Sequence, residues 1–147
     1  MAQFLVVFDV DSTLIENEVI ELLAARAGAE REVTEITTRA MNGELDFEQS
    51  LRSRVATLAG LAESVIAECA RDIRVTNGAE ELIRAVKRAG GRAAAVSGGF
   101  HELLDPLASS LGLDYARANR LEVVNGTLTG AVLGPVIDAQ AKADALH

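Results

Sequence analysis

The chain has 147 residues, of which 49% are hydrophobic and only 3% are aromatic. Its formal net charge of −8, from 14 basic and 22 acidic residues, argues against a nucleic-acid partner. The single cysteine, Cys69, excludes an intramolecular disulfide and a cysteine-rich metal site, and its helical context predicts a small buried hydrophobe. Because the sequence shows neither a signal peptide nor a run of about 18 apolar residues, we expect no membrane partner and a cytoplasmic location.

The first expected element is a strand at residues 4–8, whose β-forming side chains predict burial on both faces of a sheet. Helical patterns follow without an intervening strand, and Asp46 is the expected N-cap of the third. These helices are predicted at residues 19–28, 30–42, 46–58 and 62–71. The arrangement indicates a helical unit inserted after the first strand.

Strands and helices then alternate. We predict a helix at residues 79–89, a strand at 92–96, a helix at 103–111 and a strand at 115–118. The pair Asn125-Gly126 between two β-rich runs at residues 121–133 predicts a hairpin. A further helical pattern begins at Asp138. The alternation predicts an α/β fold built on a parallel sheet with right-handed crossovers.

Two unusual clusters fall at the carboxyl ends of predicted strands, the edge where open α/β sheets bind ligands. Asp9 and Asp11 follow the first strand, and two such close carboxylates favour a hard cation such as Mg²⁺. One carboxylate can attack phosphorus while the other acts as general acid and base. The alternative is an ordinary turn in which an Asp or Ser caps a helix.

The second cluster, Ser97-Gly98-Gly99, ends a strand and is predicted to open a helix. A hydroxyl and free backbone N–H groups at a helix N-terminus form an anion site, and glycines let a phosphate approach closely. The alternative is a simple strand-to-helix turn capped by Ser97. Lys142 would add a positive charge to the site, and its alternative is a solvated helix lysine.

In this order the segments resemble motifs of the haloacid dehalogenase superfamily. FDVDSTL at residues 8–14 resembles its first motif, VSGGF at residues 96–100 resembles its second, and Lys142 stands where the third is expected. Further stretches are similar to the phosphoserine phosphatases of that superfamily: residues 18–22, 36–41, 45–47, 50–52 and 121–123. The resemblance therefore runs along the whole chain.

The resemblance implies a Rossmann-like parallel sheet with an inserted helical cap. Residues 1–13 and 73–147 would form the core, and residues 14–72 the cap. Asp9 would be the nucleophile that becomes an aspartyl-phosphate, and Asp11 the general acid and base. Mg²⁺ would be held by the Asp9 carboxylate and the Asp11 backbone carbonyl.

The implied reaction is hydrolysis of O-phosphoserine to serine and phosphate, the last step of serine biosynthesis. Ser97, Gly98 and Lys142 would hold the phosphoryl oxygens. Further substrate contacts would come from Glu18 to the ammonium, Arg54 to the carboxylate, and Met41 and Phe47 to the apolar wall. Their alternatives are a first-turn helix acid, a surface arginine and ordinary core residues.

The superfamily has a fourth, acidic motif, which this sequence does not show before His147. We therefore expect the C-terminal part of the core, with one metal ligand, to be absent from this chain. Truncation is the favoured explanation, and the others are a contribution from another chain and a stable remnant without activity. Another small-molecule phosphatase or phosphotransferase of this fold is the rival function, and a homodimer is left open.

Overall fold

The computed structural model describes residues 3–137, whose strands form one sheet in the order β1-β2-β3-β4. The strands are β1 (Leu5–Phe8), β2 (Arg92–Phe100), β3 (Tyr115–Val124) and β4 (Thr127–Leu133). β1, β2 and β3 run parallel, and β4 runs antiparallel to β3. The predicted α/β fold with a parallel sheet is confirmed, and the antiparallel strand comes from the predicted hairpin.

A two-residue turn joins β3 to β4. Asn125 and Gly126 have φ angles of 55° and 75°, and Val124 pairs with Thr127 across the turn. Such a turn needs positive φ at both central residues, which asparagine and glycine tolerate best. The local sequence alone therefore decides this hairpin.

The predicted helical unit is present between β1 and β2. It comprises α1 (Val19–Ala27), α2 (Glu30–Met41), α3 (Phe47–Ala56) and α4 (Glu63–Arg71). Gly28 ends α1 in the left-handed conformation, with φ of 69°. Asp46 caps α3 as predicted, because its carboxylate accepts the Gln49 N–H at 2.7 Å while the Gln49 side chain accepts the Asp46 N–H.

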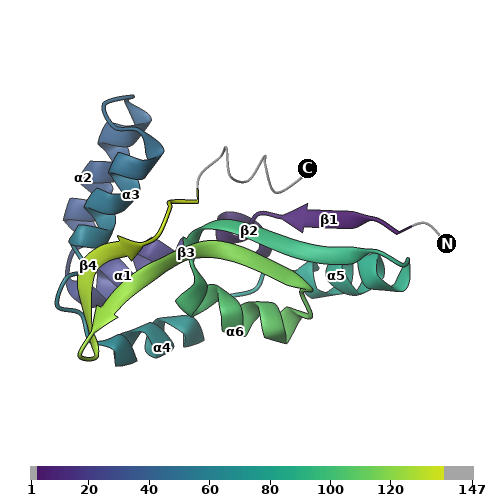
Figure 1. Ribbon diagram of the computed structural model, residues 1–147. Helices are drawn as coiled ribbons and strands as arrows, with labels where there is room; N and C mark the ends of the chain where they lie inside the picture. Colours follow the sequence, from purple (N-terminus) through teal and green to yellow (C-terminus); the bar gives the residue numbers. More distant parts are fainter. Residues whose placement is uncertain (1–2, 138–147) are drawn as a thin grey trace.

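The remaining helices are α5 (Ala79–Arg88), which contacts β2, and α6 (His101–Leu111), which contacts β2 and β3. The pair α2 and α3 projects from one end of the sheet beside β4, and α3 packs against β4 (Figure 1). One hydrophobic core joins the sheet to the helices. Its largest fully buried side chains include Phe100, Ile15, Leu23, Leu58, Ile83 and Leu103.

Burial of the parallel strands differs from one to the next. Residues 93–97 of β2 are buried, as expected for a strand covered on both faces. The same expectation is wrong for β1, where Leu5 is 49% exposed. Within residues 3–137, β1 hydrogen-bonds only to β2, so it lies at an edge and keeps one side open. No helix in this part of the chain has the length and apolar character that a bilayer crossing requires.

Candidate active site

The acidic cluster sits in a tight turn directly after β1. Asp9 is extended (φ −77°, ψ 157°), makes no helix-capping bond through its side chain, and leads into the short helical turn η1 (Val10–Leu14). Ser12 takes the left-handed conformation with φ of 58°. Val10 and Leu14 are 2% and 3% exposed, so the turn is anchored in the core. The capping alternative for Asp9 therefore finds no support.

A second segment of chain holds the exit of this turn. The Glu16 N–H donates to the Arg74 carbonyl at 2.7 Å, and the Thr76 N–H donates to the Leu14 carbonyl at 2.9 Å. The Arg74 N–H donates in turn to Asn17 Oδ1 at 2.7 Å. Glu18, at the start of α1, is thus placed by bonds between residues about sixty positions apart in the chain.

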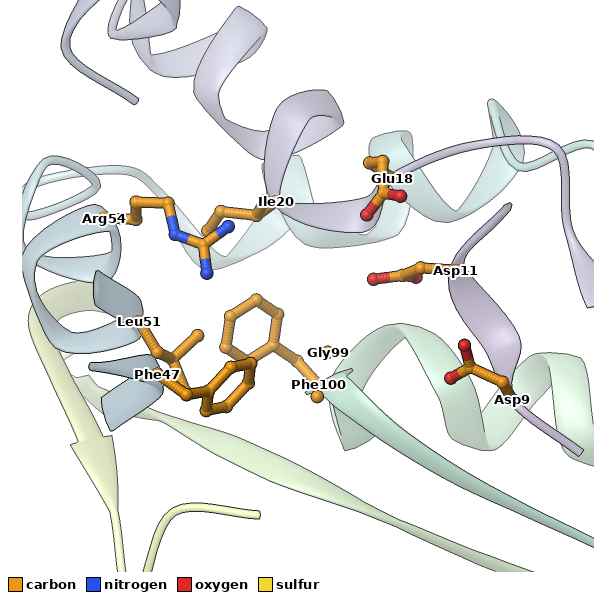
Figure 2. Close-up of a pocket in the computed structure, with 10 residues that line it drawn as sticks. Asp9, Asp11, Glu18, Ile20, Phe47, Leu51, Arg54, Gly99 and Phe100 are labelled. Carbon is orange, nitrogen blue, oxygen red and sulfur yellow. The ribbon is translucent and has the colours of Figure 1, made fainter. Parts of the chain in front are cut away.

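A pocket of ≈ 220 Å³ lies at the carboxyl ends of β1 and β2. Figure 2 shows Arg54 pointing into it from α3, with the carboxylates of Asp11 and Glu18 on the opposite side. The pocket brings together six of the nine predicted site residues: Asp9, Asp11, Glu18, Phe47, Arg54 and Gly98. Residues more than eighty positions apart therefore meet in one pocket.

The pocket is lined by three acidic side chains, Asp9, Asp11 and Glu18, and one basic side chain, Arg54. Arg54 is half-buried, and its Nε donates to the Ser50 carbonyl at 3.3 Å. Burial lowers the pKa of Arg54, while the negative charges of Glu18, Asp11 and Glu21 oppose that shift. Because an arginine does not lose its proton in proteins, the guanidinium stays positive. The pocket can thus receive a negative group beside Arg54 and a positive group beside Glu18.

The glycine-rich segment differs from its prediction. β2 continues through Ser97 to Phe100, and α6 begins at His101, so the prediction that Ser97-Gly98-Gly99 opens the helix is wrong. Ser97 is 2% exposed, and its hydroxyl accepts the Gly99 N–H at 2.8 Å in place of capping α6. This local bond holds the segment extended, since the Ser97 side chain satisfies the backbone two residues on.

Both glycines permit close contacts in the pocket. A Cβ at Gly98 would lie 2.9 Å from Cζ of Phe47. A Cβ at Gly99 would lie 3.1 Å from the Ser97 hydroxyl and 3.7 Å from Oδ2 of Asp11. Side chains at these positions would crowd the aromatic wall and the acidic turn. The glycine-rich segment thus runs directly beside the carboxylates.

Three predicted residues do not line this pocket. Met41 is 82% exposed and lies with Phe47 and Arg54 on a neighbouring groove of ≈ 310 Å³. Ser97 is buried and is not among the lining residues, and Lys142 lies outside the described residues. Sequence reasoning assigned no site role to three further lining residues, Ile20, Leu51 and Phe100, whereas Gly99 was expected in the anion site. Gly99 and Phe100 had a signal in the VSGGF string, whereas Ile20 and Leu51 look like core residues of any helix.

Metal binding can be judged from the oxygen donors. Asp9 and Asp11 both face the pocket, and carboxylate oxygens are the donors that Mg²⁺ prefers. Within residues 3–137, no three or more His, Cys, Asp or Glu side chains gather in a metal-binding group. The two carboxylates fit a hard cation that takes its other ligands from water, backbone or substrate.

The chain is similar in sequence to known phosphoserine phosphatases. It is 57% identical over 146 residues to phosphoserine phosphatase of Streptomyces coelicolor and 49% identical over 145 residues to that of Lactococcus lactis subsp. lactis. The chain spans 36% and 67% of the lengths of these relatives.

A solved structure of a phospho-aspartyl intermediate analogue of phosphoserine phosphatase matches with a TM-score of 0.91 and 46% identity, covering 99% of this chain and 69% of that one. The sequence model of the haloacid dehalogenase-like hydrolase family matches residues 6–147. The acidic turn and the glycine-rich strand end thus stand in a chain that belongs to the haloacid dehalogenase-like hydrolase family.

Proposed function

We propose that this chain forms the catalytic part of a phosphoserine phosphatase, which hydrolyses O-phosphoserine to serine and phosphate. The observation that carries the proposal is that Glu18 and Arg54 lie on opposite sides of a pocket that also contains Asp9 and Asp11. The amino-acid end of phosphoserine carries an ammonium and a carboxylate, and the pocket offers a charge of the opposite sign to each. A phosphate ester without that end would leave both charges unused. The names of the relatives support the same substrate.

In the first half of the proposed reaction, a carboxylate oxygen of Asp9 attacks phosphorus. The bond between phosphorus and the serine oxygen breaks, and Asp11 gives its proton to that leaving oxygen. The products are an aspartyl-phosphate on Asp9 and free serine. Glu18 and Arg54 hold the amino-acid end so that phosphorus faces Asp9.

In the second half, Asp11 takes a proton from water, and the water oxygen attacks phosphorus. The bond between phosphorus and Asp9 breaks, so the Asp9 carboxylate is restored and phosphate leaves. The Ser97 hydroxyl, the Gly98 backbone and Lys142 are proposed to hold the phosphoryl oxygens.

Phosphatases of this family generally use a divalent metal ion, and we propose Mg²⁺ here. The Asp9 carboxylate and the Asp11 backbone carbonyl would hold it. When bound, the ion would supply positive charge against the phosphoryl oxygens.

We also propose that residues 14–72 act as a cap over a core formed by residues 1–13 and 73–147. The strands β1 to β4 of the described residues lie in the proposed core ranges, and helices α1 to α4 lie in the proposed cap. Arg54 and Phe47 both come from α3, so a movement of this helix would open or close the pocket. Met41, exposed on the adjacent groove, would join the apolar wall on closure.

The test is phosphate release from L-phosphoserine with Mg²⁺ by this chain and by Asp9→Asn, which keeps the size of the side chain but replaces the nucleophilic carboxylate with a neutral amide. We expect release by the unchanged chain and a loss of roughly 10⁴-fold or more in the variant. Circular dichroism confirms that both samples are folded. Release that survives Asp9→Asn, or a folded chain that releases no phosphate, contradicts the proposal for this chain.

A further inference from the structure

The pairing between β2 and β3 is interrupted at the glycine-rich segment. Val96 pairs with Arg117, and the next pair is Phe100 with Asn119. Residues 97–99 of β2 therefore stand opposite Ala118 alone. Such a bulge frees backbone N–H and C=O groups that a regular ladder would use, and these groups need other partners.

Side chains bond backbone groups in the bulge and just beyond it. The Asn119 Nδ2 group donates to the Gly98 carbonyl at 3.0 Å. The Ala118 N–H donates to His101 Nε2 at 3.1 Å, and the Leu121 N–H donates to Glu102 Oε1 at 2.7 Å. Three side-chain bonds thus join the glycine-rich segment and the start of α6 to β3. Only the bond from Asn119 acts on a peptide that borders the pocket.

Asn119 is held firmly in its orientation. Its side chain is 1% exposed, and its Oδ1 accepts the Ile137 N–H at 2.7 Å while its Nδ2 donates to Gly98. An amide with an acceptor bond on one end and a donor bond on the other cannot flip without losing both. The Gly98 carbonyl therefore has a fixed direction.

The direction of the Gly98 carbonyl also fixes the direction of the Gly99 N–H, which belongs to the same peptide group and bonds to Ser97. The described residues contain no cis peptide bond, and in a trans peptide the Gly98 C=O and the Gly99 N–H point in opposite directions. The carbonyl meets Asn119, and the Gly99 N–H meets the Ser97 hydroxyl at 2.8 Å. Because that hydroxyl already accepts a bond from Gly99, its own proton remains to be donated elsewhere.

We propose that Asn119 is a positioning residue for the phosphate site: it orients the Gly98–Gly99 peptide so that the Ser97 hydroxyl donates its proton to a phosphoryl oxygen of the substrate. The Asn119 amide is bonded at both ends within the protein, to Gly98 and to Ile137, so it acts through the Gly98–Gly99 peptide and Ser97 and does not contact the substrate. The inference rests on the proposed phosphatase function, in which Ser97 is a phosphate ligand.

The experiment compares Asn119→Ala with Glu102→Ala. Glu102 makes a matched bond across the same junction to β3, but not to the Gly98–Gly99 peptide. We expect Asn119→Ala to lower kcat/KM for phosphoserine by roughly 10-fold to 100-fold, because misplaced groups lose that much in rate. Glu102→Ala should lower the melting temperature but keep kcat/KM within about 2-fold of the unchanged chain, because Glu102 does not bond to the Gly98–Gly99 peptide.

A double-mutant cycle with Ser97→Ala separates positioning from stability. If Asn119 acts through the Ser97 hydroxyl, adding Asn119→Ala to Ser97→Ala should cost less than about 3-fold more, because the shared effect is already lost. The inference is overturned if Asn119→Ala lowers kcat/KM by the same factor with and without Ser97→Ala. It is also overturned if Asn119→Ala lowers kcat/KM no more than Glu102→Ala does. Hydrolysis that is unaffected by both Asp9→Asn and Ser97→Ala instead overturns the proposed function.

Amide hydrogen exchange gives a readout that does not depend on activity. Removing the Asn119 donor should speed exchange of the Gly99 N–H by roughly 10-fold or more, as its bond to Ser97 loosens. Glu102→Ala should leave Gly99 unchanged. If Asn119→Ala does not fold, Asn119→Asp serves the same comparison, since it keeps the volume and the acceptor for Ile137 and replaces the donor to Gly98 with a carboxylate oxygen, which repels the Gly98 carbonyl. Unchanged Gly99 exchange in the folded variant overturns the inference.

Discussion

The Ser12 hydroxyl donates a hydrogen bond of 2.7 Å to Oε1 of Glu18. Ser12 is at the left-handed position of the acidic turn, and Glu18 begins α1, so the bond links the turn that carries Asp11 to the mouth of the pocket. A carboxylate can accept further bonds through its second oxygen. The Ser12 bond therefore orients Glu18 and leaves Oε2 for the substrate ammonium proposed above.

Ser12→Ala should raise KM for phosphoserine by roughly 2-fold to 5-fold, because one exposed hydrogen bond to a charged group contributes modestly. The KM for an aryl phosphate, which lacks the ammonium, should stay unchanged. Thr13→Ala is the control, since Thr13 is exposed in the same turn. An equal rise in KM for both substrates would show that the Ser12 bond supports the turn as a whole.

Arg54→Ala should damage use of phosphoserine far more than use of an aryl phosphate. Removing the charge that is proposed to face the substrate carboxylate should raise KM for phosphoserine by roughly 10-fold to 100-fold. Arg52→Ala on the same helix is the control, because Arg52 is exposed and its ion pair is with Glu48, 3.7 Å away. Equal losses on both substrates would remove Arg54 from its proposed role.

Gly98→Ala should crowd Phe47, whose Cζ lies 2.9 Å from the position of the new Cβ. We expect kcat/KM to fall roughly 10-fold as the ring moves within the pocket. Adding Phe47→Leu should restore part of the loss by removing the ring atom that clashes. Gly99→Ala should show no such rescue, because its new Cβ would meet Ser97 and Asp11. Absence of rescue in Gly98→Ala/Phe47→Leu would contradict the predicted clash.

The ionised Asp114 side chain should stabilise the fold at neutral pH and lose this effect at acid pH. Its Oδ2 accepts the Ala93 N–H at 2.9 Å, and that bond holds the pKa of Asp114 below its ordinary value of 3.8. The carboxylate is charged in both folded and unfolded chains above that value, so its contribution is complete there. The contribution disappears as pH falls through the lower pKa of the folded state.

Urea unfolding of the unchanged chain and of Asp114→Asn tests this at pH 7 and near pH 3. The unchanged chain should be the more stable at pH 7, and the difference should shrink at the lower pH. Glu81→Gln, an exposed acid on α5, is the control and should show no such trend. A difference that is constant with pH would contradict the assignment.

Much of the fold follows from local sequence. The N-cap at Asp46 and the hairpin at Asn125-Gly126 need only bonds and backbone angles within a few residues, so the sequence predicts them correctly. The position of Asp9 and Asp11 after a strand was likewise predictable, because strand ends and acidic turns are visible in the pattern.

Other features depend on contacts between distant segments. The bulge opposite Ala118 arises because β2 resumes its pairing with β3 at Phe100 and Asn119, a contact between distant segments that no local pattern records. The role of Asn119 exists only because β3 brings its side chain to Gly98.

The sequence by itself determined the family, the order of the elements and most of the charged groups in the pocket, because these are properties of residue type and spacing. Only the tertiary structure decided that Phe47 lines the pocket while Met41, 82% exposed, lies only on the neighbouring groove, although both belong to the same helical unit. Burial depends on what packs against a side chain, and Met41 is the last residue of α2, one of the two helices that project from the sheet (Figure 1).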